Sequence, residues 1–517
     1  MQKTKAFMLA VLLVAIAFIA AGIGCKQASE PTPSPIAQVQ KPAISPSAWQ
    51  MPVDVFPPSP SPTPTPAQND WLNLGWQTFV ALDWPAVAGS SGQPDQSSTI
   101  GAVAANGALV PTVWNTYRDL STIMLANGTD PGAAYSQQTS IPSGCSAIGS
   151  NPVAPGFQPM FVDGSTFPQA TIVKDYINQA TGNPLVDQES WYTITDILLD
   201  QSEYTYIQQN QYFLGSAQVA AYKKNGKLAP FPKTGQEFNT PLPSYAQYGA
   251  LEVKAAWRVL DPVADKAIIP RYYTQWGYFM QPDGKTCQGP TLFGLIGLHI
   301  LRLTPSTGST WFWATFEQVD NTSAPAGMNA TLAAANTPNG NCGSTYNVGP
   351  PQVTGNIPWS PTNKPNNLCQ VTPIPPDVQQ ANQNWQKQLQ GTVWQYYQMV
   401  NTLNPCSPGD SSCSTFSPLY DQSNQVNLNV YANTAIESYF QTHSCMDCHG
   451  SATGNGAPSK FTGTNQIFTF ALLNAYYTET PAKAARQRYL KLFRTPPHSR
   501  LVAVPKAKPG KEKYQKK

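Results

Sequence analysis

Residues 292–303 read Leu-Phe-Gly-Leu-Ile-Gly-Leu-His-Ile-Leu-Arg-Leu, an almost entirely apolar run. Residues 304–310, Thr-Pro-Ser-Thr-Gly-Ser-Thr, separate it from residues 311–319, Trp-Phe-Trp-Ala-Thr-Phe-Glu-Gln-Val. Branched and aromatic residues favour strands, and a short turn-forming segment between two such runs indicates a hairpin. The two runs are therefore predicted to be neighbouring antiparallel strands.

Two earlier runs have the same character. Leu251 to Leu260 and Tyr272 to Met280 are rich in aromatic and branched residues, with a period near two. The four runs predict a central antiparallel sheet in a mixed domain over residues 69–429, which makes the fold class α+β. Residues 321–376 are rich in Asn, Pro and Gly and are predicted to form long loops pinned by cysteines.

The hairpin predicts which side chains meet across the sheet. If it closes at 304–310, Thr315 lies opposite His299, and Glu317 lies opposite Gly297. A histidine among leucines is more often a core residue with a hydrogen-bond partner than a ligand. Alternation along the strand predicts the other members of the His299 face: Leu295, Gly297, Leu301 and Leu303.

Charged residues alternate with apolar ones in the strand that begins at Leu251. Glu252, Lys254 and Arg258 share one face. The plain interpretation is a solvated polar face. The alternative is a pocket of Glu252, Lys254, His299 and Glu317 that performs acid–base chemistry beside a cofactor.

Helices are predicted before and after the sheet. Trp71 to Leu82 has one apolar face and ends before Pro85, and a second helix is predicted near Val113 to Leu125. A polar helix follows Asp377. Its predicted apolar side carries Trp385, Leu389, Val393, Tyr396 and Val400.

Cys445-Met446-Asp447-Cys448-His449 matches the attachment motif of c-type haem. Two thiols three positions apart can reach both vinyl groups on one porphyrin edge, and the next histidine then lies under the iron. A dithiol redox site would require a helix that opens at the first cysteine, and a zinc site would require a second ligand pair. The motif therefore predicts one covalent haem c with His449 as the proximal ligand.

The segment 430–500 resembles a small all-α class I cytochrome c domain, with helices predicted at Tyr431–His443, Gln466–Tyr477 and Thr480–Phe493. That family usually supplies a methionine after the motif as sixth ligand, and this chain has none after Met446. The remaining candidates for the distal side are His299, His498, an upstream methionine such as Met399, or no protein ligand.

Most of the mature chain, about 70–480, resembles a largely uncharacterised family of bacterial exported mono-haem cytochrome c-like proteins. The resemblance rests on Trp76-Gln-Thr-Phe79-Val-Ala-Leu-Asp-Trp84-Pro85, Glu252-Val-Lys254-Ala-Ala-Trp257, Gly297-Leu-His299-Ile and Thr315-Phe-Glu317-Gln-Val-Asp320-Asn321. It implies a single-haem, cytochrome-like protein and no particular reaction.

The N-terminus indicates export. Lys3 and Lys5 precede an apolar and small-residue run, 6–23, and Cys25 follows it, an arrangement that resembles a bacterial lipoprotein signal. Residues 1–25 are therefore predicted to be a signal peptide with lipidation at Cys25; plain cleavage and an uncleaved anchor helix are the alternatives. Residues 26–68 form a Pro/Ser/Thr-rich linker, and 501–517 a basic disordered tail.

The other cysteines fit an oxidising compartment. Removing Cys25, Cys445 and Cys448 from the nine leaves six, an even number that allows three disulfides. Cys406 and Cys413 bracket a turn-rich loop and are the favoured pair. The pairs Cys342–Cys369 and Cys145–Cys287 follow by elimination only, and buried free thiols are the alternative.

The composition narrows the function. The chain is 41% apolar and 11% charged, which is typical of a globular protein. Its net charge is +3, and its excess of positive charge lies in the C-terminal tail rather than in a nucleic-acid-binding stripe. The leading hypothesis is an exported, membrane-tethered electron-transfer protein with an unidentified redox partner protein. The alternatives are a haem-dependent oxidase or peroxidase with a catalytic large domain, and a surface binding module with a structural haem.

Overall fold

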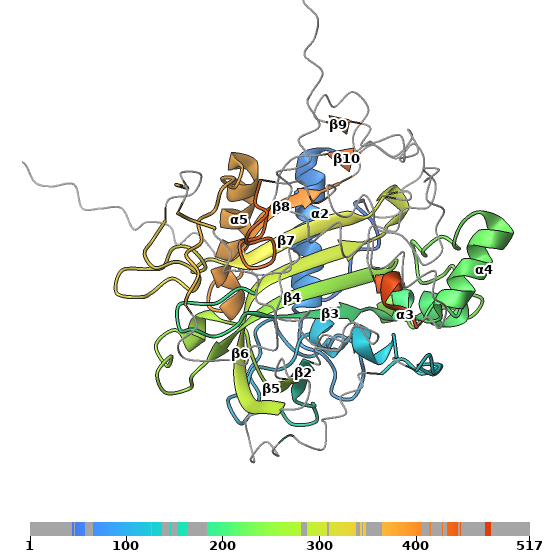
Figure 1. Ribbon diagram of the computed structural model, residues 1–517, viewed down its shortest axis with the longest axis horizontal. Coiled ribbons are helices and arrows are strands. Elements are labelled where there is room, and N and C mark those ends of the chain that lie inside the picture. The colour runs from blue at the N-terminus through green and yellow to red at the C-terminus, as the bar shows by residue number, and fades with distance from the viewer. Residues whose placement is uncertain are drawn as a thin grey trace, which may run out of the picture. The chain divides into compact units, whose positions relative to one another are not determined.

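The fold is organised around one long strand, β6 (Cys287–Arg302), in the computed structural model of the chain (Figure 1). The described residues belong to one compact unit, Ala43–Lys517. The residues that the structure describes are 44–45, 47–56, 66–125, 127–136, 145, 153–162, 184–280, 287–307, 310–337, 342–343, 345–347, 364–404, 413–414, 426–427, 432–442, 445 and 471–476.

An eight-stranded sheet surrounds β6. One edge of β6 pairs with β4, while its other edge pairs first with β5 and then with β7, so the sheet divides there into two arms. All strand pairs in this sheet are antiparallel except β2 with β5. The other strands are β1 (Arg118–Asp119), β2 (Met160–Val162), β3 (Ile194–Leu199), β4 (Leu251–Leu260), β5 (Thr274–Met280), β7 (Phe312–Gln318) and β8 (Tyr397–Leu403), with β9 (Cys413–Ser414) and β10 (Val426–Asn427) in a separate pair.

The central antiparallel sheet confirms the mixed fold class, and the four predicted strands are β4 to β7. The predicted register is also confirmed, because His299 pairs with Thr315 and Gly297 with Glu317. The predicted His299 face is wrong for one residue, Leu295. Ala256 pairs with Gly297 but Trp257 pairs with Leu295, so Ile296 is an extra residue that reverses the alternation and turns Leu295 to the opposite face.

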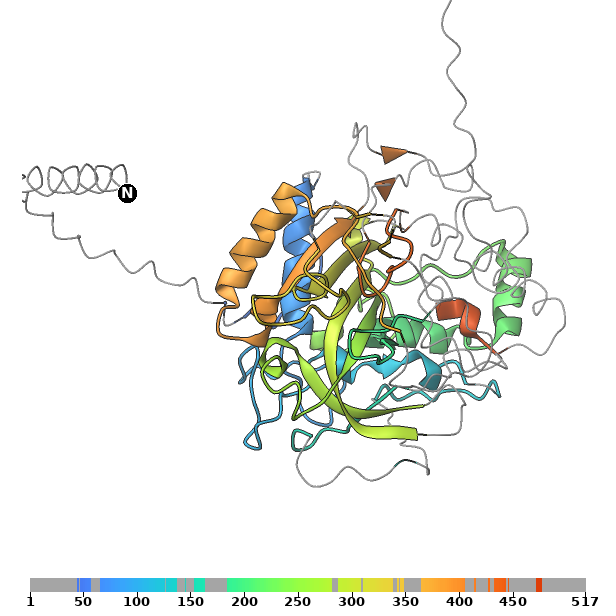
Figure 2. The ribbon, with the colours of Figure 1, turned by 60° about the vertical axis from the view of Figure 1, so that its left-hand side comes forward.

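Two helices cover that opposite face (Figure 2). Helix α2 (Gln68–Leu82) confirms the prediction at Trp71–Leu82, and α5 (Pro376–Gln388) lies beside it. Phe79 of α2 is fully buried and stacks on Phe316 of β7 at a centroid distance of 4.2 Å. Aromatic contacts of this kind bury a large apolar area, which makes this layer the main core.

Other helix predictions are wrong in part. Instead of a helix over 113–125, two 3₁₀ turns, Trp114–Thr116 and Leu120–Thr122, flank β1, and the Asp119 side chain accepts from Ser121 N. The helix after Asp377 ends at Gln388, because Gly391 turns the chain with a φ of +88°. Val400 therefore lies in β8 rather than on that helix.

Two predicted disulfides are present. Cys145 is bonded to Cys287, and Cys342 to Cys369. The favoured pair, Cys406–Cys413, lies outside the described side chains. Within the predicted linker, residues 47–56 contact the domain: Pro52 O accepts from Arg302 Nη2 at 2.6 Å, and Asp54 Oδ2 accepts from Ser306 Oγ at 2.8 Å.

Phe79→Ala tests the importance of the aromatic layer. Removing this ring leaves a cavity between α2 and β7, and we expect a loss of about 3–5 kcal/mol in the free energy of unfolding. Urea denaturation measures the loss. Val263→Ala is the control, because Val263 is 85% exposed. A loss no larger than that of the control would contradict the assignment of Phe79 to the core.

Candidate functional site

The face of the sheet opposite α2 carries a row of polar side chains. Lys254 of β4 pairs with His299 of β6, His299 with Thr315 of β7, and Thr315 with Asn401 of β8. Residues directly opposite in antiparallel strands point to the same side, so these four lie in one row across the sheet. We call this side the polar face.

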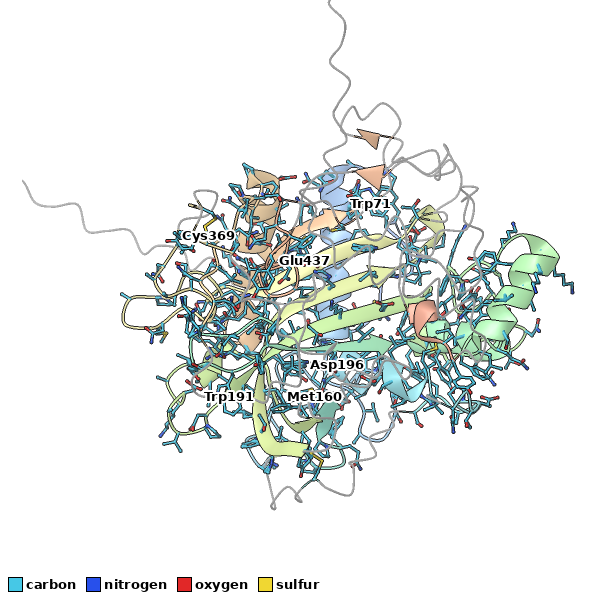
Figure 3. The ribbon with its side chains drawn as sticks, viewed as in Figure 1. Trp71, Met160, Trp191, Asp196, Cys369 and Glu437 are labelled. Atoms are coloured by element: carbon cyan, nitrogen blue, oxygen red, sulfur yellow. A yellow bond between two sulfur atoms is a disulfide. The ribbon has the colours of Figure 1, made fainter. Side chains whose placement is uncertain are left out.

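The polar face is buried. Glu252, His299 and Glu317 are 6%, 7% and 3% exposed. The interpretation of a solvated face on β4 is therefore wrong for Glu252, and also for Arg258, which is 2% exposed. The predicted grouping of Glu252, Lys254, His299 and Glu317 on one face agrees with the strand register. Residues 432–442 cover this face, and Figure 3 shows their Glu437 in front of the central strands. We call residues 432–442 the covering segment.

Hydrogen bonds hold the covering segment to β7. Asn433 Nδ2 donates to Thr315 Oγ1 at 3.0 Å and to Phe316 O at 2.6 Å. The backbone N–H and the hydroxyl of Thr434 both donate to Glu317 Oε2, at 3.1 and 2.5 Å. Gly297 permits this close approach, because a Cβ there would lie 3.0 Å from Asn433 Oδ1. Buried polar atoms of the sheet thus find their partners in a segment far along the chain.

The helix predicted at Tyr431–His443 is wrong over the residues described. Residues 432–442 form turns. Asn433 Oδ1 accepts from Ala435 N at 2.9 Å, and Glu437 Oε2 accepts from Asn433 N at 2.9 Å. Local side-chain bonds to the backbone compete with helix formation, and the bonds to β7 add to this competition.

His299 and Glu437 form an ionic contact on the polar face. His299 Nε2 lies 3.3 Å from Glu437 Oε2. Burial raises the pKa of Glu437, but His299, Lys254 and the Asn433 N–H together outweigh burial, so this pKa is lowered. Burial lowers the pKa of Lys254, an effect that Glu437 and Glu252 oppose. The carboxylate of Glu437 is therefore stabilised between two basic side chains.

Cys445 shares a pocket with His299. It lines a pocket with five polar-face residues, His299, Trp313, Thr315, Asn401 and Leu403, and with Ala314 and Thr402. It is half-buried and packs against the apolar cluster that contains Trp313 and Leu403. The first cysteine of the predicted motif and the predicted histidine His299 are thus brought together.

A short C-terminal segment joins the same apolar cluster. Residues Ala471–Asn474 form a 3₁₀ turn inside the helix predicted at Gln466–Tyr477. Leu472 belongs to the cluster beside Cys445, and its carbonyl accepts from Gln218 Nε2 of α4 (Gly215–Asn225) at 2.9 Å. The helix predicted at Thr480–Phe493 lies outside the described residues.

The surroundings of Cys445 are compatible with a covalently attached haem. The thiol lies between apolar walls, Trp313 and Leu403, and polar ones, His299 and Asn401. His299 Nε2 is buried, and Glu437 Oε2 lies 3.3 Å from it. Among those residues no cluster of three or more His, Cys, Asp and Glu could hold a metal ion. Cys25, Cys448, His449 and His498 lie outside the described residues.

Comparison with known proteins gives no relative. No protein-family model, no curated protein and no solved structure matches the chain. Sequence patterns did not predict Asn433, Thr434 or Glu437 as site residues. The only sequence feature that could have indicated them was the segment 431–443, shortly before the Cys445 motif. We predicted a helix for this segment.

Thr434→Val tests whether the covering segment is held by Glu317. The substitution keeps the shape of the side chain but removes the hydroxyl that donates to a buried carboxylate, and we expect a loss of about 1.5–3 kcal/mol. Thermal unfolding measures the stability, and limited proteolysis measures exposure of the segment. Thr99→Val, at an exposed position, is the control. Equal stability and equal protease resistance in the two variants would refute this role of Thr434.

Proposed function

We propose that the chain is an exported c-type haem protein that transfers electrons through one covalent haem at Cys445, Cys448 and His449. The observation that supports the proposal is the position of Cys445, against a pocket on the polar face that also contains His299. Cys445 and His299 are far apart in the sequence. The Cys445 motif alone does not require a sheet histidine nearby, and His299 alone does not require a cysteine nearby.

The roles of the residues follow from their chemistry. Cys445 and Cys448 would form the thioether links, and His449 would be the proximal ligand; the bound group would supply a reversible one-electron couple. Trp313 and Leu403 give the pocket an apolar wall on the side where Cys445 packs. The covering segment fixes the chain just before the motif through Asn433 and Thr434. The small all-α cytochrome-like domain belongs to this proposal.

His299 is our candidate for the distal ligand. It shares the pocket with Cys445, and a carboxylate beside the imidazole, here Glu437, is the usual arrangement around a ligating histidine. Met399 does not share this location, because it packs in the α2 core, where a Cβ on Gly75 would lie 2.7 Å from its Cε. His498 is the competing candidate.

Covalent attachment is tested by solvent extraction. Protein from a host with a haem-ligation system should keep its haem colour through acid–acetone treatment and a denaturing gel. The double variant Cys445→Ala/Cys448→Ala should lose the colour, and Met446→Leu, inside the same motif, should keep it. Complete extraction of the colour from the native protein would refute the proposal.

His299→Ala tests distal ligation. We expect a shifted Soret band or a new high-spin signal, because the iron loses a strong-field ligand, while circular dichroism confirms that the fold is intact. His498→Ala is the matched variant and should leave the spectrum unchanged. The opposite result, with only His498→Ala changing the spectrum, would assign the distal side to His498.

Lipidation at Cys25 belongs to the same proposal and rests on the sequence. Among the described residues no helix is long and apolar enough to cross a membrane. Cys25→Ser should move the protein out of the membrane fraction or block its processing, because the acyl anchor would be lost. Ser29→Ala is the control. Unchanged fractionation of Cys25→Ser would favour an uncleaved helix or simple secretion.

A haem-dependent oxidoreductase is the second candidate. The observation that favours it is the group of titratable side chains, Lys254, His299 and Glu437, beside the Cys445 pocket. Steady-state peroxide consumption with an artificial electron donor distinguishes the two. Turnover that depends on Glu437 would support the enzyme, and no turnover would support electron transfer.

A further inference from the structure

Two buried carboxyl groups, those of Glu203 and Glu252, have no role in the proposed electron transfer. Glu203 lies in the first turn of α3 (Gln201–Gln209) and is fully buried. Neither of its carboxyl oxygens has a hydrogen-bond partner among the described residues. Glu252 of β4, which is 6% exposed, is its principal charged neighbour. We call Glu203 and Glu252 the carboxyl pair.

The charged and titratable groups around the pair belong to several elements. Asp200, Glu252 and Tyr206 interact with Glu203, while Lys254 interacts with Glu252 and with Glu437 of the covering segment. Asp200 has a structural role, because its carboxylate accepts from three backbone N–H groups, those of Ser202, Glu203 and Leu251. Glu203 accepts no such bonds. Beyond Lys254 and Glu437 lies His299.

The strand register places Glu252 on the same face of the sheet as the Cys445 pocket, two strands from Trp313. Glu252 pairs with Leu301, Leu301 with Trp313, and Trp313 with Leu403. Trp313 and Leu403 line the Cys445 pocket. Glu252 is also the diagonal neighbour of His299 across β4 and β6, a position that corresponds to about 7–8 Å in antiparallel sheets.

Two ionised carboxylates close together in the protein interior repel each other, and burial adds a further free-energy cost for each charge. Burial is the main cause that raises the pKa of Glu203 well above its ordinary value, and the charges of Glu252 and Asp200 raise it further. A pair of this kind holds one proton over a wide pH range and titrates as a unit. A nearby change of one electron charge acts strongly on that proton, because the interior screens charges weakly.

We propose that the carboxyl pair is a proton-uptake site coupled to reduction of the haem. The inference rests on the proposed function. When a one-electron donor protein reduces the bound haem, the pair would take up one proton from hydronium, and oxidation would release it. One O–H bond of hydronium breaks as one O–H bond forms in the pair, and the added electron and proton leave the net charge of the interior unchanged.

The proposal fixes the sign of a pH effect. At pH values where the ferric protein has lost the shared proton but the ferrous protein still holds it, reduction takes up a proton, so the midpoint potential falls as pH rises. Full coupling of one proton to one electron gives a slope of about 59 mV per pH unit. Below that range both forms hold the proton and the potential is independent of pH.

Redox potentiometry of the full-length haem protein, from about pH 5 to about pH 10, tests the inference. The potential of the native protein should fall with pH over part of this range, because burial and the charge of Glu252 hold the pKa of Glu203 above its ordinary value. Glu203→Gln and Glu252→Gln should each flatten the curve there. Glu237→Gln, at an exposed carboxylate, should leave the slope unchanged.

A redox-difference infrared spectrum of the native protein gives a readout that needs no variant. In the same pH range, reduction should increase the C=O band of a protonated carboxylic acid, with a shift in heavy water, and Glu203→Gln should remove the band. A covalent haem whose potential is independent of pH, or a slope that survives in both variants, overturns this inference alone. A protein without covalent haem overturns the proposed function as well.

Discussion

Hydrogen bonds between the covering segment and β7 are the interaction on which the site depends. The polar face buries Thr315 and Glu317, and the groups that satisfy them come from Asn433 and Thr434. Without these donors, a buried carboxylate would lose partners and the face would become hydrated. The same bonds determine where the chain leaves the sheet, and therefore where Cys445 begins the motif.

The two faces of the sheet have different roles, packing on one and the proposed site on the other. The face under α2 and α5 is filled with large apolar side chains, such as Phe79 and Phe316, and supplies most of the packing energy. The opposite face carries ionisable groups that apolar packing could not tolerate without partners. Stability and the proposed redox chemistry are thus located on opposite sides of one layer, and β6 contributes to both.

The sheet was predictable because its signals are local. Alternation and the hairpin after Leu303 were enough to predict that Thr315 lies opposite His299, and the Cys445 motif is a short pattern with its own chemistry. The extra residue Ile296 has no such signal, because the run around it is uniformly apolar. The covering segment was misinterpreted as a helix because the partners of Asn433 and Thr434 are more than a hundred residues away.

That separation has a consequence for how the chain folds during synthesis. Asn433 and Thr315 are 118 positions apart. The β6–β7 hairpin therefore emerges well before the residues that close its polar face, and for that interval water must solvate Glu317. Docking of the covering segment is a late, non-local event, of the kind that slows folding in proteins of high contact order. Cys445 emerges later still, when the strands of the sheet have already been synthesised and can pair.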